Sequence, residues 1–214
     1  MAKPEWFRKS SWSPDDEADF RARLGRSRAA GRAQYLRLQA YHLQEVGTTE
    51  LVSAALSLLD ELITNHPDSS ECASAHLQRG QCLADLGRLE QALAAYREAF
   101  EAQRKRPNVQ TDVHLTFGEL VLALRRKDLY REAVERLDEF AGHEVFPAEL
   151  YRLAAIRALI ADAHGEHEVA RDQARRALEA SARTESPFRY HRKLGLVRLV
   201  DPEVHQRLLA LSAT

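Results

Sequence analysis

The sequence predicts an all-helical protein, and three observations support that prediction. The 214-residue chain contains 33 Ala and 30 Leu against 9 Gly and 7 Pro, and Ala and Leu favour helices strongly. No segment alternates apolar and polar residues between turn signals, as a half-buried strand does. Glycines and prolines separate segments of helix length along most of the chain.

The first predicted helix covers residues 14–27 and has clear start signals. Ser13 stands at the N-cap, Pro14 follows it, and acidic residues fill the first turn. Phe20 and Leu24 share one face, and Gly31 is expected to end the helical segment. Three aromatic residues precede this helix, and we expect them to cap the end of the helical stack, with an exposed partner-binding hook as the alternative. They are Trp6, Phe7 and Trp12.

Eight further helices are predicted in pairs, followed by a short helix over 202–211. A short turn lies inside each pair and a proline follows it, and the unit recurs about every 35–40 residues, which is typical of a helical solenoid. The paired segments are 32–46 with 49–65, 71–86 with 89–105, 111–126 with 130–141, and 148–163 with 168–183.

The second pair resembles a tetratricopeptide repeat, a helix–turn–helix unit of about 34 residues. In a repeat that begins at Ala73, family positions 8, 11, 15, 20, 24 and 27 are filled by Gly80, Leu83, Gly87, Ala92, Tyr96 and Ala99. Small residues at positions 8 and 20 let the two helices approach closely, and the aromatic residue at position 24 fills the gap between them.

The other pairs match the same pattern less completely. Ala40 and Gly47, Gly118, and Ala158 and Gly165 keep positions 8 or 15. The resemblance implies a right-handed α–α solenoid of about four repeats, at 33–70, 71–110, 111–147 and 148–186. Residues 1–32 would form an N-terminal cap, and residues 187–214 a C-terminal tail and cap.

Charge and apolar content exclude several classes of protein. The chain has 31 basic and 32 acidic residues, a net charge of −1, which argues against a dedicated DNA-coating or membrane-surface protein. It has no apolar run of membrane-spanning length and no apolar secretory core at its N-terminus. Cys72 and Cys82 are too far apart on one predicted helix to pair. These features favour the bacterial cytoplasm and no membrane partner.

Charge is unevenly distributed along the chain. Residues 1–40 carry nine basic and five acidic groups, whereas residues 41–103 carry three and ten. A solvated surface explains this most simply; the alternative is an acidic face for a basic partner. Six arginines of the first helices raise the alternative of a nucleic-acid-associated regulator, although helical spacing scatters them around the axis. They are Arg21, Arg23, Arg26, Arg28, Arg32 and Arg37.

No motif predicts catalysis or a cofactor. His164 and His167 lie in a predicted turn, but two ligands do not make a zinc site. Cys72 and His76 share a helix face, yet His76 and His114 occupy a packing position of the repeat. Motifs for a nucleophilic serine, a phosphate loop or a metalloprotease are absent from the sequence. We therefore expect a non-enzymatic protein without a cofactor or metal.

The resemblance implies that the first helix of each pair lines a concave groove. The groove would combine a leucine strip with flanking acids, which suits an amphipathic helix or extended peptide with basic neighbours. The lysine and asparagine of the family's carboxylate clamp are absent, which disfavours a chaperone tail as the ligand. The alternative is that the chain's own termini or a second copy cover the strip, as in a homo-oligomer. The predicted lining is Arg37, Tyr41, Leu77, Gln81, Asp85, Leu115, Glu119, Leu122, Arg152, Leu159 and Asp162.

Overall fold

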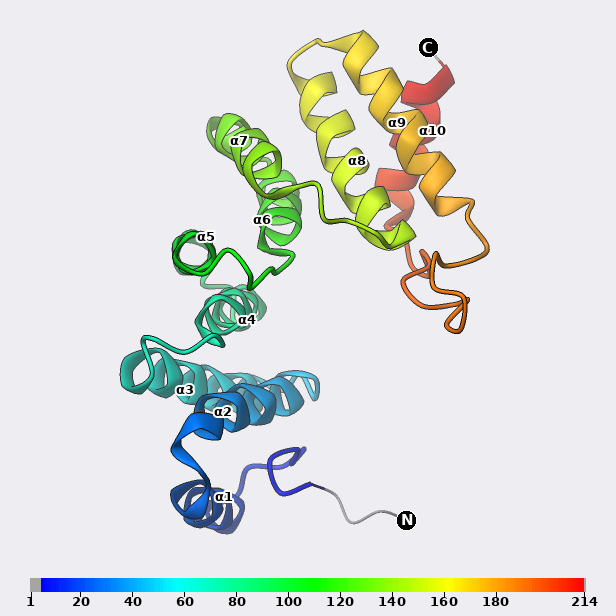
Figure 1. Ribbon diagram of the computed structural model, residues 1–214. Helices are drawn as coiled ribbons and strands as arrows, with labels where there is room; N and C mark the ends of the chain where they lie inside the picture. The colour runs from blue at the N-terminus through cyan, green and yellow to red at the C-terminus, as the bar shows by residue number, and fades with distance from the viewer. Residues whose placement is uncertain (1–4, 214) are drawn as a thin grey trace. The chain divides into compact units, whose positions relative to one another are not determined.

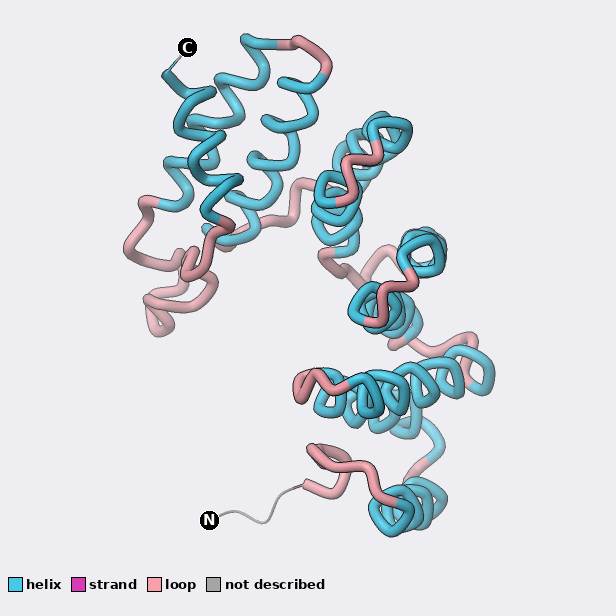
Figure 2. Tube along the Cα trace, turned by 180° about the vertical axis from the view of Figure 1, so that it is seen from behind, coloured by secondary structure: helices cyan, strands magenta, loops and turns pink. Residues whose placement is uncertain are grey.

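The computed structural model describes residues 5–213, which form ten α-helices and one short 3-10 helix (Figure 1). No part of this described range is a strand (Figure 2). The all-helical prediction is therefore confirmed. Backbone contacts divide the chain into two compact units, one ending at Val113 and the other starting at His114.

The first unit contains five helices, and its core lies between successive helices. The helices α2 and α3 pack together, as do α4 and α5, and α3 also packs on α4. Small and large apolar residues alternate in these contacts, with Ala55, Leu59, Ala92 and Tyr96 almost completely buried. The helices are α1 (Pro14–Arg26), α2 (Ala29–Gln44), α3 (Thr49–Asn65), α4 (Cys72–Asp85) and α5 (Leu89–Lys105).

The aromatic leader, which is the segment 5–13 that precedes α1 and carries Trp6, Phe7 and Trp12, packs against the first two helices. The ring of Trp6 lies 4.8 Å from that of Tyr35 and 5.5 Å from that of Phe20, and Trp12 also contacts Phe20. The buried amide of Gln39 fixes the leader by its main chain. Its Oε1 accepts from the Lys9 amide nitrogen at 3.0 Å, and its Nε2 donates to the Lys9 carbonyl at 2.8 Å.

The prediction that Gly31 ends a helix is wrong. The chain turns earlier, at Ser27 and Arg28, and α2 begins at Ala29. The Arg32 guanidinium donates to the carbonyl oxygens of Gly25 and Ser27 and so holds this turn. Gly31 therefore lies inside the first turns of α2, where alanines on its N-terminal side favour the helix.

The second unit is built around a pair of alanine-rich helices, α8 and α9, against which α10 packs. Ala158, Ala174 and Ala177 are fully buried at this contact, and Leu208 of α10 inserts into the same core. Small side chains allow the helix axes to approach closely. The elements of this unit are α6 (Val113–Ala123), which begins at the unit boundary, a 3-10 turn (Lys127–Leu129), α7 (Tyr130–Phe140), α8 (Pro147–Ala163), α9 (His167–Ser181) and α10 (Pro202–Ala213).

Helix α6 is shorter at both ends than the predicted 111–126. At its start, the backbone amide of Thr111 donates to the buried Gln103 side chain at 2.8 Å, which holds Thr111 outside the helix. At its end, Arg125 has a left-handed backbone with φ of 51°. That conformation cannot continue a right-handed helix.

Candidate partner-binding cleft

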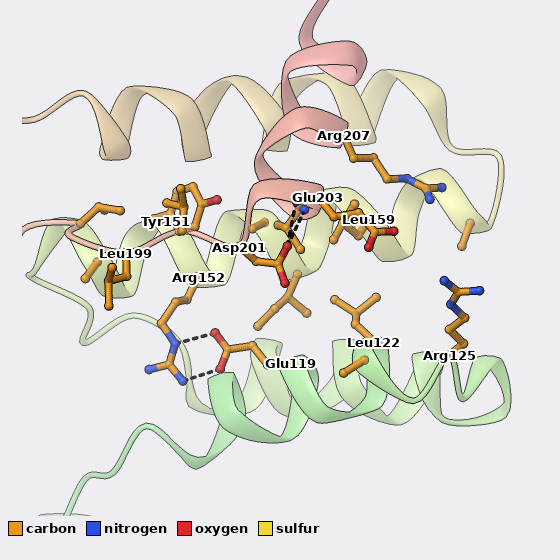
Figure 3. A pocket seen from close by; sticks show the side chains of 18 of the residues that line it. Glu119, Leu122, Arg125, Tyr151, Arg152, Leu159, Leu199, Asp201, Glu203 and Arg207 are labelled. Atoms are coloured by element: carbon orange, nitrogen blue, oxygen red, sulfur yellow. Dashed lines mark hydrogen bonds and ion pairs between the residues drawn. The ribbon is translucent and has the colours of Figure 1, made fainter.

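The second unit contains a cleft of about 830 Å³, bounded by α6, α8 and the segment 197–207 that enters α10 (Figure 3). Leu122 of α6 faces Leu159 of α8 across it, with Arg125 near one end and Leu199 near the other. Its volume is in the range of pockets that bind small organic ligands. Its apolar lining includes Leu122, Ala155, Ile156, Leu159, Val197, Leu199, Val200 and Val204.

Contacts at the start of α8 determine the position of the segment that closes the cleft. The backbone of Gly195, with φ of 67°, lies against the ring of Phe146 with no room for a β-carbon. The Gly195 carbonyl accepts from the Ala148 amide at 2.9 Å. Phe146 also stacks on Phe188 at 5.2 Å between ring centroids. These contacts direct residues 197–201 along the cleft before Pro202 begins α10.

The acidic side chains predicted for this part of the groove are already paired. The guanidinium of Arg152 donates to both carboxylate oxygens of Glu119, at 2.6 and 2.7 Å. Arg207 of α10 donates to Asp162 at 2.6 Å. Asp201 accepts from backbone amides at the start of α10 and so serves as its cap. Glu203 also lines the cleft, where it is exposed and has no ion pair among the described residues. The uncompensated negative charge of the lining is therefore confined to Glu203 and the capping Asp201.

Three basic side chains of the lining remain without an acidic partner in the described part of the chain. Arg125 and Lys127 are exposed at one end of the cleft. Arg198 is exposed next to Leu199, and its hydrogen bond goes to the Lys193 carbonyl at 3.4 Å rather than to a carboxylate. The lining thus carries available positive charge at its ends and aliphatic surface between them.

One buried polar group also faces this region. Tyr151 lines the cleft and is 7% exposed, and its hydroxyl has no hydrogen-bond partner among the described residues. Burial raises the pKa of this hydroxyl, and the negative charge of Asp201 adds to the effect. A buried hydroxyl without a partner is costly to the fold.

Four predicted groove residues line the cleft, and others do not. Glu119, Leu122, Arg152 and Leu159 lie in it, while Asp162 holds Arg207 at its edge. Leu115 is fully buried. Its predicted place in an accessible leucine strip is therefore wrong, because its side chain is taken up in helix packing.

In the first unit, most of the predicted groove residues are engaged within the protein. Leu77 is buried, so its predicted place in an accessible leucine strip is also wrong. Arg37 pairs with Glu71, and Asp85 accepts from Gln44 at 3.0 Å. Tyr41 is exposed and Gln81 is half-buried, so these two keep a surface position.

Most of the arginine cluster of the first helices is also engaged within the protein. Arg21 pairs with Glu61, Arg23 with Asp19, and Arg37 with Glu71. Arg32 holds the turn before α2. Such pairing lowers the number of guanidinium groups available to a phosphate backbone.

The cysteine and histidine candidates form no reactive arrangement. Cys72 and Cys82 are free thiols; burial raises the pKa of both, to about 12 for Cys82. Burial lowers the pKa of His76, which lies with Cys72 at a hollow in the first unit. His114 is buried against Glu144 at 2.7 Å. Within residues 5–213, no three His, Cys, Asp or Glu side chains are arranged to hold a metal ion.

The sequence did not assign residues 197–207 or Arg125 to the lining, although coverage of the leucine strip by the chain's own termini was an alternative, and residues 197–207 do lie beside Leu122 and Leu159. The tail gave no local sign of the helix it would contact. Arg125 did carry a signal, because it occupies the position that glycine fills in the other three predicted repeats. A non-glycine residue is uncommon at a turn position with a positive φ, and this singles out Arg125.

Comparisons with known proteins support the fold alone. No protein-family model matches the chain, and no curated protein sequence matches it. A similar solved structure is the crystal structure of BtubC (BKLC) from P. vanneervenii, with a TM-score of 0.59 and 17% sequence identity over 87% of this chain and 80% of that one. In the described chain, no helix is both long and apolar enough to cross a membrane.

Proposed function

We propose that this chain is a non-enzymatic protein-binding module of the bacterial cytoplasm, built as an α-solenoid of about four tetratricopeptide-like helix pairs. The cleft of the second unit carries the proposal. It joins an aliphatic floor and charged ends in one place. Apolar anchors between polar contacts are the usual means by which grooves hold peptide segments.

The repeat pattern supports the solenoid part of this proposal. Position 20 of each repeat is an alanine, and all four of these alanines are fully buried in the structure. Glycine ends α2, α4 and α8 in a left-handed conformation at the position that the repeat assigns to it. The alanines are Ala55, Ala92, Ala133 and Ala170.

A pull-down with matched variants tests the proposed function. Leu159→Glu places a charge on the floor of the cleft, where the leucine is half-buried. Val169→Glu places the same charge on α9, where the valine is 48% exposed and outside the cleft lining. We expect partners to be lost with Leu159→Glu and retained with Val169→Glu, while circular dichroism shows both variants folded. Equal retention by both variants would move the binding site away from the cleft.

A further inference from the structure

Arg125 gives the clearest information on the ligand chemistry of the cleft. It follows the end of α6 and has a φ of 51°. Every other described residue with a positive φ is a glycine. The equivalent positions after α2, α4 and α8 are Gly47, Gly87 and Gly165, with φ between 72° and 81°. The same turn is thus made three times with glycine and once with arginine.

Arginine is a costly choice for this backbone conformation. A β-carbon is strained in the left-handed region, whereas glycine is not. Strained residues persist mainly at ligand-binding and functional sites. The exposed Arg125 guanidinium lies at the rim of the cleft, near the same end as Arg207 (Figure 3). Its side chain therefore offers a reason for the strain that the turn alone does not.

The charge of the lining favours an anionic ligand. Glu119 and Asp162 are neutralised by Arg152 and Arg207, and Asp201 is used as a helix cap. Glu203 is the exposed carboxylate of the lining without an ion pair in the described chain, against three basic side chains without one. Arg125 and Lys127 at one end have no ion-pair partner in the described chain. At the other end, Arg198 adjoins a tail in which residues 189–193 hold two arginines and one lysine and no acid. Complementary charge at both ends would fix the register of a bound segment.

The floor of the cleft distinguishes between anionic ligands. Single-stranded nucleic acids are held by exposed aromatic side chains on which bases stack. Here the floor is aliphatic, formed by residues such as Leu122, Leu159 and Val204, and the aromatic side chains of the lining, Tyr130 and Tyr151, are buried. Aliphatic floors accept apolar side chains of polypeptides.

We propose that the cleft binds an acidic polypeptide segment. Its apolar side chains occupy the floor between Leu122 and Leu159, and its carboxylates pair with Arg125 and Lys127. This inference rests on the proposed function and replaces the basic partner expected from the sequence. Of the acidic side chains behind that expectation, Glu119 and Asp162 are paired with arginines, whereas Asp85 of the first unit is hydrogen-bonded to Gln44.

Selection of displayed random peptides on the full chain tests the inference. The immobilised proteins are the wild type, Leu159→Glu and Arg125→Gly. We expect the peptides that bind the wild type but not Leu159→Glu to be rich in Asp and Glu beside leucine or aromatic residues. Arg125→Gly should lower the affinity for these peptides at least about tenfold, because a charge-assisted hydrogen bond is lost. The melting temperature of the variant should equal or exceed that of the wild type. Arg26→Gln, an exposed arginine of the first unit, is the matched control and should leave their affinity unchanged.

The remaining outcomes overturn one or both proposals. Basic or uncharged peptides that need Leu159 would keep the proposed function and overturn the acidic partner. Acidic peptides that bind Arg125→Gly as tightly as the wild type would also overturn the acidic partner as assigned. If no selected peptide depends on Leu159, both proposals fail. A labelled single-stranded oligothymidine bound more tightly than any peptide, and released by Arg125→Gly, would assign the cleft to nucleic acid instead.

Discussion

Gly80 of α4 lies so close to the ring of Tyr96 of α5 that no β-carbon fits between them. This contact joins positions 8 and 24 of the repeat pattern, and Tyr96 is almost completely buried in it. The aromatic ring therefore fills the space that the missing side chain leaves. The close packing of α4 on α5 depends on this pair.

The first prediction concerns that pair. Gly80→Ala forces the Tyr96 ring to move in a packed core, and we expect it to lower the free energy of unfolding by about 1–3 kcal/mol. Gly25→Ala is the control, because a β-carbon at Gly25 in α1 meets no atom within 4 Å. That change should raise stability by up to about 1 kcal/mol. Urea unfolding followed by circular dichroism measures both, and a neutral Gly80→Ala would contradict the packing described.

A second prediction concerns the leader. Gln39→Leu removes both hydrogen bonds to the Lys9 main chain and leaves those groups unsatisfied, which costs about 1–3 kcal/mol. We expect the leader to loosen and the fluorescence of Trp6 and Trp12 to shift to longer wavelength. Gln34→Leu, at an exposed position of the same helix, should leave the spectrum unchanged. An unchanged spectrum in Gln39→Leu would show that aromatic packing alone holds the leader.

The third prediction concerns pH. Burial raises the pKa of Glu144, but hydrogen bonds from the Gly142 amide and His114 outweigh it and leave that pKa below its ordinary value. The carboxylate therefore stabilises the fold at neutral pH, and this contribution is lost as the pH falls from the ordinary value through the lowered one. Wild type should be more stable than Glu144→Gln at neutral pH, and the difference should shrink in acid. A difference that is constant with pH would contradict this role of the carboxylate.

The fourth prediction concerns the thiols. Burial raises the pKa of both cysteines, and the Cys72 thiol donates to the His66 carbonyl at 3.2 Å. A protonated, buried thiol is a poor nucleophile. We expect a colorimetric disulfide reagent to react slowly with both cysteines of the native protein at pH 8. In denaturant the same reagent should react with both cysteines rapidly. Cys82→Ala separates the two signals; fast native labelling of either thiol would show that its surroundings open readily.

Most helix boundaries were predictable because residues at or next to the helix ends determine them. Glycine after α4 and α8 and proline at the start of α8 and α10 mark ends that the structure reproduces within one or two residues. Errors arose where a side chain seven or eight residues away in sequence fixes a helix end. Gln103 holds Thr111 out of α6, and Arg32 moves the start of α2 ahead of Gly31.

The cleft was only partly predictable. Helical spacing placed Leu122 and Leu159 on the correct faces, but it did not separate them from the buried Leu115. The path of residues 197–201 depends on the contact between Gly195 and Phe146, about 50 residues apart in sequence. Local pattern contains no information about such a contact.

Photo-crosslinking inside the native cell tests the central claim most directly. A benzophenone amino acid replaces Leu159 on the cleft floor or Val169 outside it, and adducts are identified by mass spectrometry. We expect a polypeptide adduct at position 159 that is absent at position 169 and disappears when Leu122→Glu is added. The same adducts at both positions, or none at position 159 in a folded protein, would contradict a partner-binding cleft.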